Sequence, residues 1–209
     1  MKIVAIDGPA AAGKGTLARR LAAELGLPYL DTGLLYRAVG RLVLDAGADP
    51  SDPIAAEAAA RRLNPSDLGR GDLRGPEADA ASSAVATSPG VRAALLEFQR
   101  GFGAKGGAVL DGRDIGTVIF PDAPAKLFVT ASPAERARRR WLELRAKGLD
   151  VDLTTVEHEM RERDERDSAR AAAPLRPADD AVVLDTSDMD AEGAFLAALV
   201  AVRNRLGLA

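Results

Sequence analysis

A glycine-framed loop at residues 8–16 places the strongest constraint on what this chain can fold into. The glycines let the backbone curl until successive N–H groups point inward, and the helical pattern that follows adds the positive end of a helix dipole. Because the loop also follows the apolar run at 3–6, the order of strand, loop and helix predicts a phosphate-binding loop. Lys14 would contact the β and γ phosphates of a nucleoside triphosphate. The alternative is a glycine-rich turn that only caps a helix. The loop reads Gly8-Pro9-Ala10-Ala11-Ala12-Gly13-Lys14-Gly15-Thr16.

Two residues, Thr16 and Asp111, are candidates for contact with a magnesium ion. The usual loop places Ser or Thr directly after the lysine, whereas here Gly15 intervenes and Thr16 carries the hydroxyl one residue later. Asp111 ends the apolar run 108–110 and would act on the metal or its waters as a Walker-B carboxylate does. We therefore expect Mg²⁺ to be held more by phosphate oxygens and water than by the loop.

The alternation of strand-like and helical segments predicts an α/β fold. Strand-like runs lie at 2–6, 29–31, 108–111, 127–130 and 182–185, and most of the segments between them are periodic enough to be helices. We therefore expect a three-layer fold in which a five-stranded parallel sheet is flanked by helices. Helices are predicted at 15–25, from the capping box at Ser132 onward, and at 190–206. In the last helix, the side chains expected to face the core are those of Phe195, Leu196, Leu199, Val202 and Leu206.

Composition and charge restrict the classes of partner. A chain of 209 residues can form one domain with a full core. Its 28 basic and 31 acidic side chains give a formal charge of −3, which offers no general attraction to nucleic acid or to an anionic membrane. The chain has no cysteine and one histidine, His158, which excludes a Cys- or His-based zinc site. No apolar run approaches the ~20 residues that span a bilayer. We expect a cytoplasmic monomer that acts on small molecules, with neither a nucleic-acid nor a membrane partner.

Two charged segments follow predicted strands, at the sheet edge where ligands bind in α/β folds. The segment at 31–37 includes Thr32 and Arg37, and its alternative interpretation is a helix cap followed by a surface cation. The segment at 111–116 places Arg113 and Asp114 in a glycine-flanked loop, where the alternative is a surface ion pair worth under ~1 kcal/mol. Charges framed by glycine at a strand's carboxyl end suit a ligand better than they suit packing.

A third charged group repeats at helical spacing. Arg163, Asp167 and Arg170 are spaced by four and then three residues, so on a helix they share one face. Acidic neighbours interleave with them, and a solvated helix with self-neutralising pairs is the ordinary interpretation. A transferring phosphoryl group, however, carries charge on its equatorial oxygens, which planar guanidiniums neutralise bidentately. A single lysine cannot do this, which favours a role for these arginines with phosphates.

Together these segments resemble the bacterial cytidylate kinases over essentially the whole chain. The resemblance rests on residues 8–16, 31–37, 111–123 and 163–170. The loop alone is shared by many kinases, whereas the combination is highly specific. The resemblance implies an enzyme that transfers the γ-phosphoryl group of ATP to CMP or dCMP with magnesium, and that releases ADP and the nucleoside diphosphate.

The same resemblance assigns the site residues. It implies that residues 8–16 and Arg139 bind ATP, although a solvated basic helix explains Arg139 equally well. An aspartate that accepts from the N4 amine is the natural complement of cytosine, whereas uracil offers an acceptor there. The implied CMP contacts are Thr32, Arg37, Arg113 and Arg170 with the phosphate, Arg163 and Asp167 with the sugar, and Ser83, Arg92 and Asp114 with the base. Lys14, Arg113 and Arg170 would carry the charge that develops during transfer.

The resemblance also divides a single kinase domain, 1–209, into parts. The core would take 1–31, 104–147 and 171–209, the monophosphate-binding region 32–103, and a lid 148–170. Family members commonly carry a small antiparallel strand insert in the second part. Here the candidate segment 64–77 is too short and too polar to supply all of it, and we expect an exposed connection with at most a short hairpin.

Three other functions stay open at this point. A kinase for UMP or dTMP would need the same loop and arginines, because these are indifferent to the base. A switch-type GTP-binding module would carry a guanine-reading Asn/Thr-Lys-x-Asp segment, and the sequence contains none. A non-catalytic nucleotide-binding module is disfavoured because arginines stand at every expected phosphate position.

Overall fold

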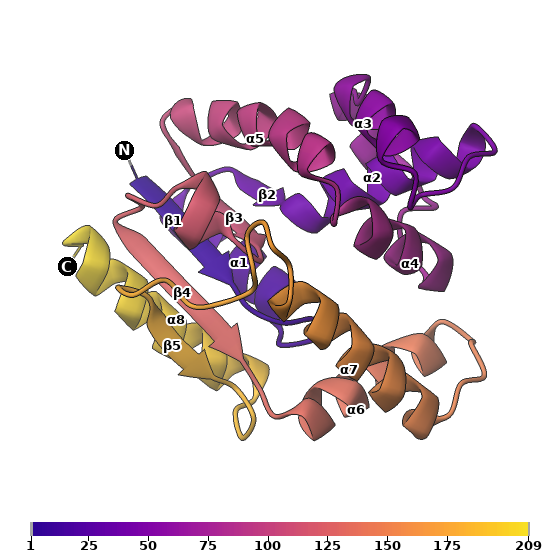
Figure 1. Ribbon diagram of the computed structural model, residues 1–209. Helices are drawn as coiled ribbons and strands as arrows, with labels where there is room; N and C mark the ends of the chain where they lie inside the picture. Colours follow the sequence, from indigo (N-terminus) through magenta and orange to yellow (C-terminus); the bar gives the residue numbers. More distant parts are fainter. Residues whose placement is uncertain (1, 209) are drawn as a thin grey trace. The chain divides into compact units, whose positions relative to one another are not determined.

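The computed structural model describes residues 2–208 and contains a five-stranded sheet in the order β2-β3-β1-β4-β5 (Figure 1). β1 is central and runs parallel to both β3 and β4, and β5 runs parallel to β4. Since parallel strands end at one edge, their carboxyl ends form the edge at which ligands bind in such folds. The strands are β1 (Lys2–Asp7), β2 (Tyr29–Asp31), β3 (Gly107–Gly112), β4 (Ala125–Thr130) and β5 (Val182–Asp185).

Helices connect and flank these strands, so the fold is of the α/β class that the sequence predicts. Within residues 2–208, none of the helices combines the length and the apolar character that a membrane span requires. The helices are α1 (Lys14–Leu25), α2 (Thr32–Asp45), α3 (Pro53–Arg61), α4 (Pro76–Val85), α5 (Pro89–Ala104), α6 (Pro133–Ala146), α7 (Leu153–Ser168) and α8 (Ala191–Leu206), with short helical turns η1 (Pro65–Gly69) and η2 (Ile115–Ile119).

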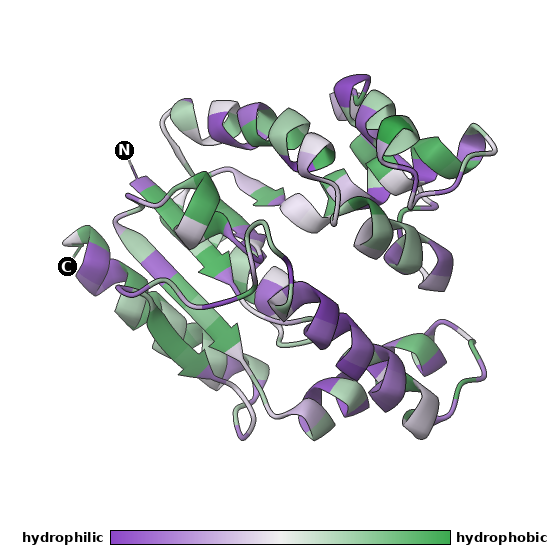
Figure 2. Cartoon of the chain, in the orientation of Figure 1, coloured by the Kyte–Doolittle hydropathy of each residue, from purple (hydrophilic) through white to green (hydrophobic). Residues whose placement is uncertain are grey.

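The chain divides into two units, of which the first comprises the residues up to 30 and those from 106 onward. Its core is aliphatic and lies where α1 and α8 pack on one face of the sheet. Leu21 of α1 and Phe195 of α8 meet Ile6 of β1 and Val129 of β4 there. Figure 2 shows these strands as largely hydrophobic and α7 as largely hydrophilic. Helix α7 accordingly buries few side chains, among them one carboxylate, Asp167.

The second unit, residues 31–105, is built from helices, with α2 packed on α4 and α3 packed on α5. Glycine allows the first of these contacts to be close. A Cβ atom added at Gly40 of α2 would lie 2.8 Å from the Cβ of Ala81 in α4. Separations under about 3 Å force a neighbour to move, so the α2–α4 packing depends on the missing side chain.

Most of the sequence-based elements are confirmed. The predicted strands occur with ends that differ by one or two residues. Helix α1 stops at Gly26, whose φ of 62° is left-handed, as a glycine C-cap requires. Helix α6 begins after Ser132, whose Oγ accepts a hydrogen bond from the Glu135 amide at 3.3 Å.

One core assignment is wrong, and one connection takes another form. Leu196 is 52% exposed, because the buried stripe of α8 instead runs through Phe195, Ala198, Leu199 and Val202. The exposed connection near residue 65 contains the 3₁₀ turn η1 in place of a hairpin. The division of the kinase domain into core, monophosphate-binding region and lid stays a prediction.

The close α2–α4 contact predicts opposite effects of the same substitution at two helical glycines. Gly40→Ala should lower the free energy of unfolding by about 1–3 kcal/mol, since its Cβ would collide with Ala81. Gly101→Ala in α5 is the matched control, because its Cβ would meet nothing within 4 Å. This control should raise the free energy of unfolding by about 0.5–1 kcal/mol. Urea unfolding of both variants measures the difference, and equal effects would contradict the packing.

Candidate active site

The loop at residues 8–16 leaves β1 at the carboxyl edge of the sheet and leads into α1. Gly8 has a φ of 145°, and a Cβ there would collide with the Val129 carbonyl of β4, so only glycine fits. Gly13 and Ala11 are also left-handed, with φ values of 89° and 57°. These conformations turn the backbone back on itself, as a phosphate-binding loop requires.

Lys14 is buried at the base of this loop, with 6% of its surface exposed. Its Nζ donates a hydrogen bond to the Pro9 carbonyl oxygen at 2.6 Å. Burial lowers the pKa of Lys14 well below its usual range, and the positive charges of Arg113 and Arg163 lower it further against the opposing effect of Asp111 and Asp7. The site is therefore one in which an added anion would favour the ammonium form of the lysine.

Asp111 is the last residue but one of β3, and it is held by a tyrosine that sequence reasoning missed. The Tyr29 hydroxyl of β2 donates to Asp111 Oδ1 at 2.7 Å, and both residues are at least half-buried. The only sequence signal for this contact is that β2 and β3 end at the same sheet edge. Thr16, the other candidate metal contact, is exposed on α1. Among residues 2–208, no group of three or more acidic or histidine side chains is placed to hold a metal ion.

Arg113 and the predicted helix face of α7 come together in an ion-pair cluster. Arg113 Nε donates to Asp167 Oδ2 at 2.9 Å, and Arg170 pairs with the other carboxylate oxygen. Asp167 is only 2% exposed, so the solvated-face interpretation is wrong for this residue. Burial raises the pKa of Asp167, but the charges of Arg113 and Arg170 outweigh it and hold that pKa below its usual value. The cluster orients two guanidiniums of the predicted phosphate site.

A cavity of about 300 Å³ opens beside the loop and α1. Arg139 lies in its wall and donates to the Thr186 carbonyl at 2.6 Å, to the Thr186 hydroxyl at 3.0 Å and to Glu135 at 2.8 Å. The interpretation of Arg139 as a freely solvated side chain is therefore wrong. It fits the neighbouring Arg138, whose side chain is 56% exposed. The cavity is lined by Ala12, Gly13, Thr16, Leu17, Arg20, Val129, Glu135, Arg138, Arg139, Thr186, Met189, Asp190, Ala191 and Ala194.

Arg136 links the loop to α7. Its guanidinium is buried and donates to the Ala10 carbonyl of the loop at 3.3 Å. It also pairs with Asp164 of α7 at 2.6 Å. The sequence alone does not indicate these two contacts, because both partners are distant along the chain.

In the second unit, two predicted acceptor residues lie in α2. Thr32 is the first residue of the helix and is buried. The N-cap position belongs to Asp31, so the alternative interpretation of this segment as a helix cap fits Asp31 and not Thr32. Arg37 pairs with Asp79 of α4 at 2.9 Å and is only 20% exposed, which contradicts its interpretation as a surface cation.

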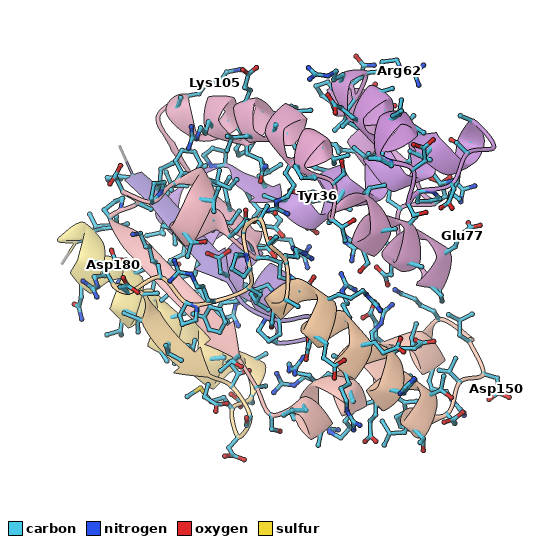
Figure 3. The ribbon with its side chains drawn as sticks, viewed as in Figure 1. Tyr36, Arg62, Glu77, Lys105, Asp150 and Asp180 are labelled. Carbon is cyan, nitrogen blue, oxygen red and sulfur yellow. The ribbon has the colours of Figure 1, made fainter. Side chains whose placement is uncertain are left out.

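Two predicted base-reading residues, Ser83 and Arg92, lie in α4 and α5 of the same unit. The guanidinium carbon of Arg92 lies 5.7 Å from the ring centre of Tyr36, a residue that Figure 3 labels. The Arg92 guanidinium also donates to the Ala86 carbonyl at 3.4 Å. The Oγ atom of Ser83 is buried without a hydrogen-bond partner among the described residues. An unsatisfied buried hydroxyl is costly unless a ligand completes it.

Asp114, the third predicted base reader, is 4% exposed and precedes η2. The turn that follows it is held by Asp7, a residue that sequence reasoning missed. The Asp7 carboxylate accepts from the Ile115 and Gly116 amides, each at 2.8 Å. Burial raises the pKa of Asp7 to about 7, with Asp114 adding to the rise, while the two backbone hydrogen bonds and Lys14 oppose it. The sequence signal that could have identified Asp7 is its position as a carboxylate directly after the apolar run 3–6.

A curled loop with a buried lysine, beside arginines fixed by a buried carboxylate at one edge of a parallel sheet, defines a phosphate-binding-loop protein of the α/β class. The family model described as cytidylate kinase matches residues 4–203. The cytidylate kinase of Granulibacter bethesdensis is 64% identical over 97% of this chain and 97% of its own length. That of Paramagnetospirillum magneticum is 66% identical over 94% and 95%. The chain belongs to the cytidylate kinase family.

A solved structure of an uncharacterized protein from Eubacterium ventriosum resembles the fold, with a TM-score of 0.55 at 16% identity and coverage of 99% of both chains. At this level of identity the likeness concerns the fold alone. It agrees with the α/β architecture described above.

The raised pKa of Asp7 predicts how stability depends on pH. Between pH values of roughly 4 and 7 the folded protein binds more protons at Asp7 than the unfolded chain does, so the free energy of unfolding falls as pH rises through this window. Relative to an Asp7→Asn variant, which cannot titrate at this position, the wild type should lose about 2–3 kcal/mol of its free energy of unfolding between pH 5 and pH 8. Urea unfolding of both proteins at each pH measures this, and a difference that does not change with pH would contradict the assignment.

Proposed function

We propose that the protein transfers the γ-phosphoryl group of ATP to CMP or dCMP, giving ADP and CDP or dCDP. The observation that carries the proposal is the buried Lys14 in its curled loop, beside Arg113 and Arg170 held by Asp167. Membership of the cytidylate kinase family supports the same reaction. Two alternatives are a kinase for UMP or dTMP and a non-catalytic nucleotide-binding module. The experiments below distinguish both from the proposed function.

The triphosphate of ATP would bind the loop at residues 8–16. Backbone N–H groups and the start of α1 offer positive potential there, and Lys14 would contact the β and γ phosphates. The nucleoside would occupy the neighbouring cavity of about 300 Å³, whose wall includes Arg139. The hydrogen bonds of Arg139 to Thr186 would hold that wall in place.

Magnesium would be held by phosphate oxygens and water, with Asp111 and Thr16 as the protein's contacts. This division fits Mg²⁺, which commonly keeps several waters and binds one or two carboxylates together with substrate phosphates. Bound there, the ion would neutralise charge between the β and γ phosphates. The hydrogen bond from Tyr29 would orient the Asp111 carboxylate toward that task.

We propose that CMP is bound by the residues that the resemblance assigns to the acceptor. They are Thr32, Arg37, Ser83, Arg92, Arg113, Asp114, Arg163, Asp167 and Arg170. Asp114 would accept from the cytosine N4 amine, and Arg92 and the buried Ser83 hydroxyl would complete the reading of the base. The part 32–103 would then serve as the monophosphate-binding region, with 64–77 as its shortened insert, and 148–170 as the lid.

Catalysis needs no protein nucleophile or general base. The acceptor phosphate oxygen attacks in line, and the protein contributes positioning and charge stabilisation. Lys14, Arg113 and Arg170 would carry the charge on the equatorial oxygens, and closure of the lid would exclude water that hydrolyses ATP. We further propose that the enzyme acts as a monomer in the cytoplasm.

Removing the buried lysine should abolish most of the activity. Lys14→Ala is expected to lower kcat by on the order of 10²-fold or more, because it removes charge stabilisation of the transition state. Lys105→Ala is the matched control, since Lys105 is an exposed lysine at the end of α5 and outside the proposed site (Figure 3). A coupled ADP-release assay measures both variants. Near-normal turnover by a folded Lys14→Ala protein would exclude the proposed role.

The choice of acceptor tests the base-reading residues. With ATP in excess, kcat/KM should be highest for CMP and dCMP and lower for UMP and dTMP, because uracil and thymine present an acceptor to Asp114. Asp114→Asn should narrow the gap between CMP and UMP, since the amide can donate as well as accept. If UMP or dTMP is the best acceptor of the wild type, the cytosine assignment is wrong and the kinase assignment remains.

A further inference from the structure

We propose that Asp7 is a positioning residue for the phosphoryl acceptor, and that its carboxylate fixes the turn that carries Arg113 and Asp114. The inference rests on the proposed function, because it assigns to Asp7 the orientation of residues proposed to bind CMP. Asp7 belongs to β1 and precedes the ATP-binding loop. Its role would therefore connect the strand of the donor loop to the acceptor residues.

The geometry of the contact is bidentate. Asp7 Oδ1 accepts from the Ile115 amide and Oδ2 from the Gly116 amide, each at 2.8 Å. Two hydrogen bonds from consecutive amides fix both the position and the direction of the peptide that follows Asp114. No other residue type offers two acceptor oxygens at this distance from the backbone without also presenting a donor, since Asn would turn an N–H group toward an amide.

Close packing around the turn restricts where its backbone can lie. Ile115 is 0% exposed and Asp114 is 4% exposed. A Cβ added at Gly116 would lie 3.2 Å from Cδ of Lys126 and 3.4 Å from Oδ2 of Asp7. Glycine at this position therefore leaves room for both the Lys126 stem and the Asp7 carboxylate, which a Cβ atom would crowd.

The turn itself has the form that makes such support necessary. The Ile119 amide donates to the Asp114 carbonyl at 3.2 Å, and the Phe120 amide donates to the Ile115 carbonyl at 2.7 Å. These are wide, five-residue turns, which are uncommon and occur frequently at functional sites. Their first amides have no partner within the turn, and the Asp7 carboxylate supplies partners for two of them.

The burial of Asp7 argues that this arrangement serves more than stability. Asp7 is 5% exposed, and a buried carboxylate is costly even when it accepts hydrogen bonds. The register places Asp7 opposite Gly112, the residue directly before Arg113. The carboxylate thus fixes the far side of the Arg113–Asp114 dipeptide, while the β1–β3 pairing fixes its near side.

The test compares the kinetic constants for the acceptor, CMP, with those for the donor, ATP, in steady-state assays of the full-length protein. Asp7→Asn should lower kcat/KM for CMP by about 10- to 100-fold, since misplacement of a positioning group by about 1 Å costs this much. The KM for ATP should change by less than about 2-fold if the donor loop is held independently by Gly8 and α1. A merely structural role would lower the thermal midpoint and leave kcat/KM for CMP of the folded protein unchanged.

Two further variants keep the inference testable if Asp7→Asn does not fold. Gly116→Ala keeps the carboxylate but crowds the contact from the other side, and it should also raise the KM for CMP more than the KM for ATP. Asp49→Asn is the matched control, because Asp49 is exposed, accepts from the Ser51 amide at 2.8 Å and is not among the proposed site residues. This control should leave both KM values unchanged.

The outcomes distinguish this inference from the proposed function. If the wild type does not phosphorylate CMP, the proposed function fails and the role of Asp7 fails with it. If the wild type is active and neither Asp7→Asn nor Gly116→Ala changes kcat/KM for CMP, the function stands and the inference about Asp7 is wrong. Equal increases in the KM values for CMP and ATP would also overturn it, because they would indicate a general disturbance of the sheet edge.

Discussion

The structure depends on how the charged side chains that it buries at the carboxyl ends of β1 and β3 are compensated. Asp7, Lys14, Asp111 and Asp114 are each at most 7% exposed, and all belong to one unit of the chain. Burial of charge opposes folding unless hydrogen bonds or opposite charges compensate for it. Backbone amides do so for Asp7, the Pro9 carbonyl for Lys14 and the Tyr29 hydroxyl for Asp111. Perturbed groups of this kind cluster at functional sites.

The same constraint explains why several arginines are held in fixed orientations. Asp167 is almost fully buried between Arg113 and Arg170, and Asp164 holds Arg136 against the loop. Fixed guanidiniums need little reorganisation when charge develops on a phosphoryl group, which is how electrostatic stabilisation becomes effective. If Arg113 and Arg170 bind phosphate as proposed, Asp167 would position both of them.

Local patterns in the sequence were sufficient for the loop, the strands and most helix ends, because glycine, capping residues and apolar periodicity act over a few positions. The loop at residues 8–16 and the strand-end charges were found in this way. Contacts between distant positions were not, since they depend on strand order and register. Tyr29 meets Asp111 from 82 positions away, and Asp7 meets Ile115 from 108 positions away. Leu196 was misplaced because an Ala-rich helix offers two similar apolar stripes, and only packing chooses between them.

The central claim is that the loop and the arginines perform transfer between two nucleotides, and the fate of the γ phosphorus tests it most directly. Phosphorus-31 NMR of ATP, CMP and Mg²⁺ with the purified protein follows every phosphate at once. The account predicts that CDP and ADP appear in equal amounts without inorganic phosphate, and that ATP is stable when CMP is omitted. Release of inorganic phosphate in place of CDP, or no consumption of ATP, would contradict it.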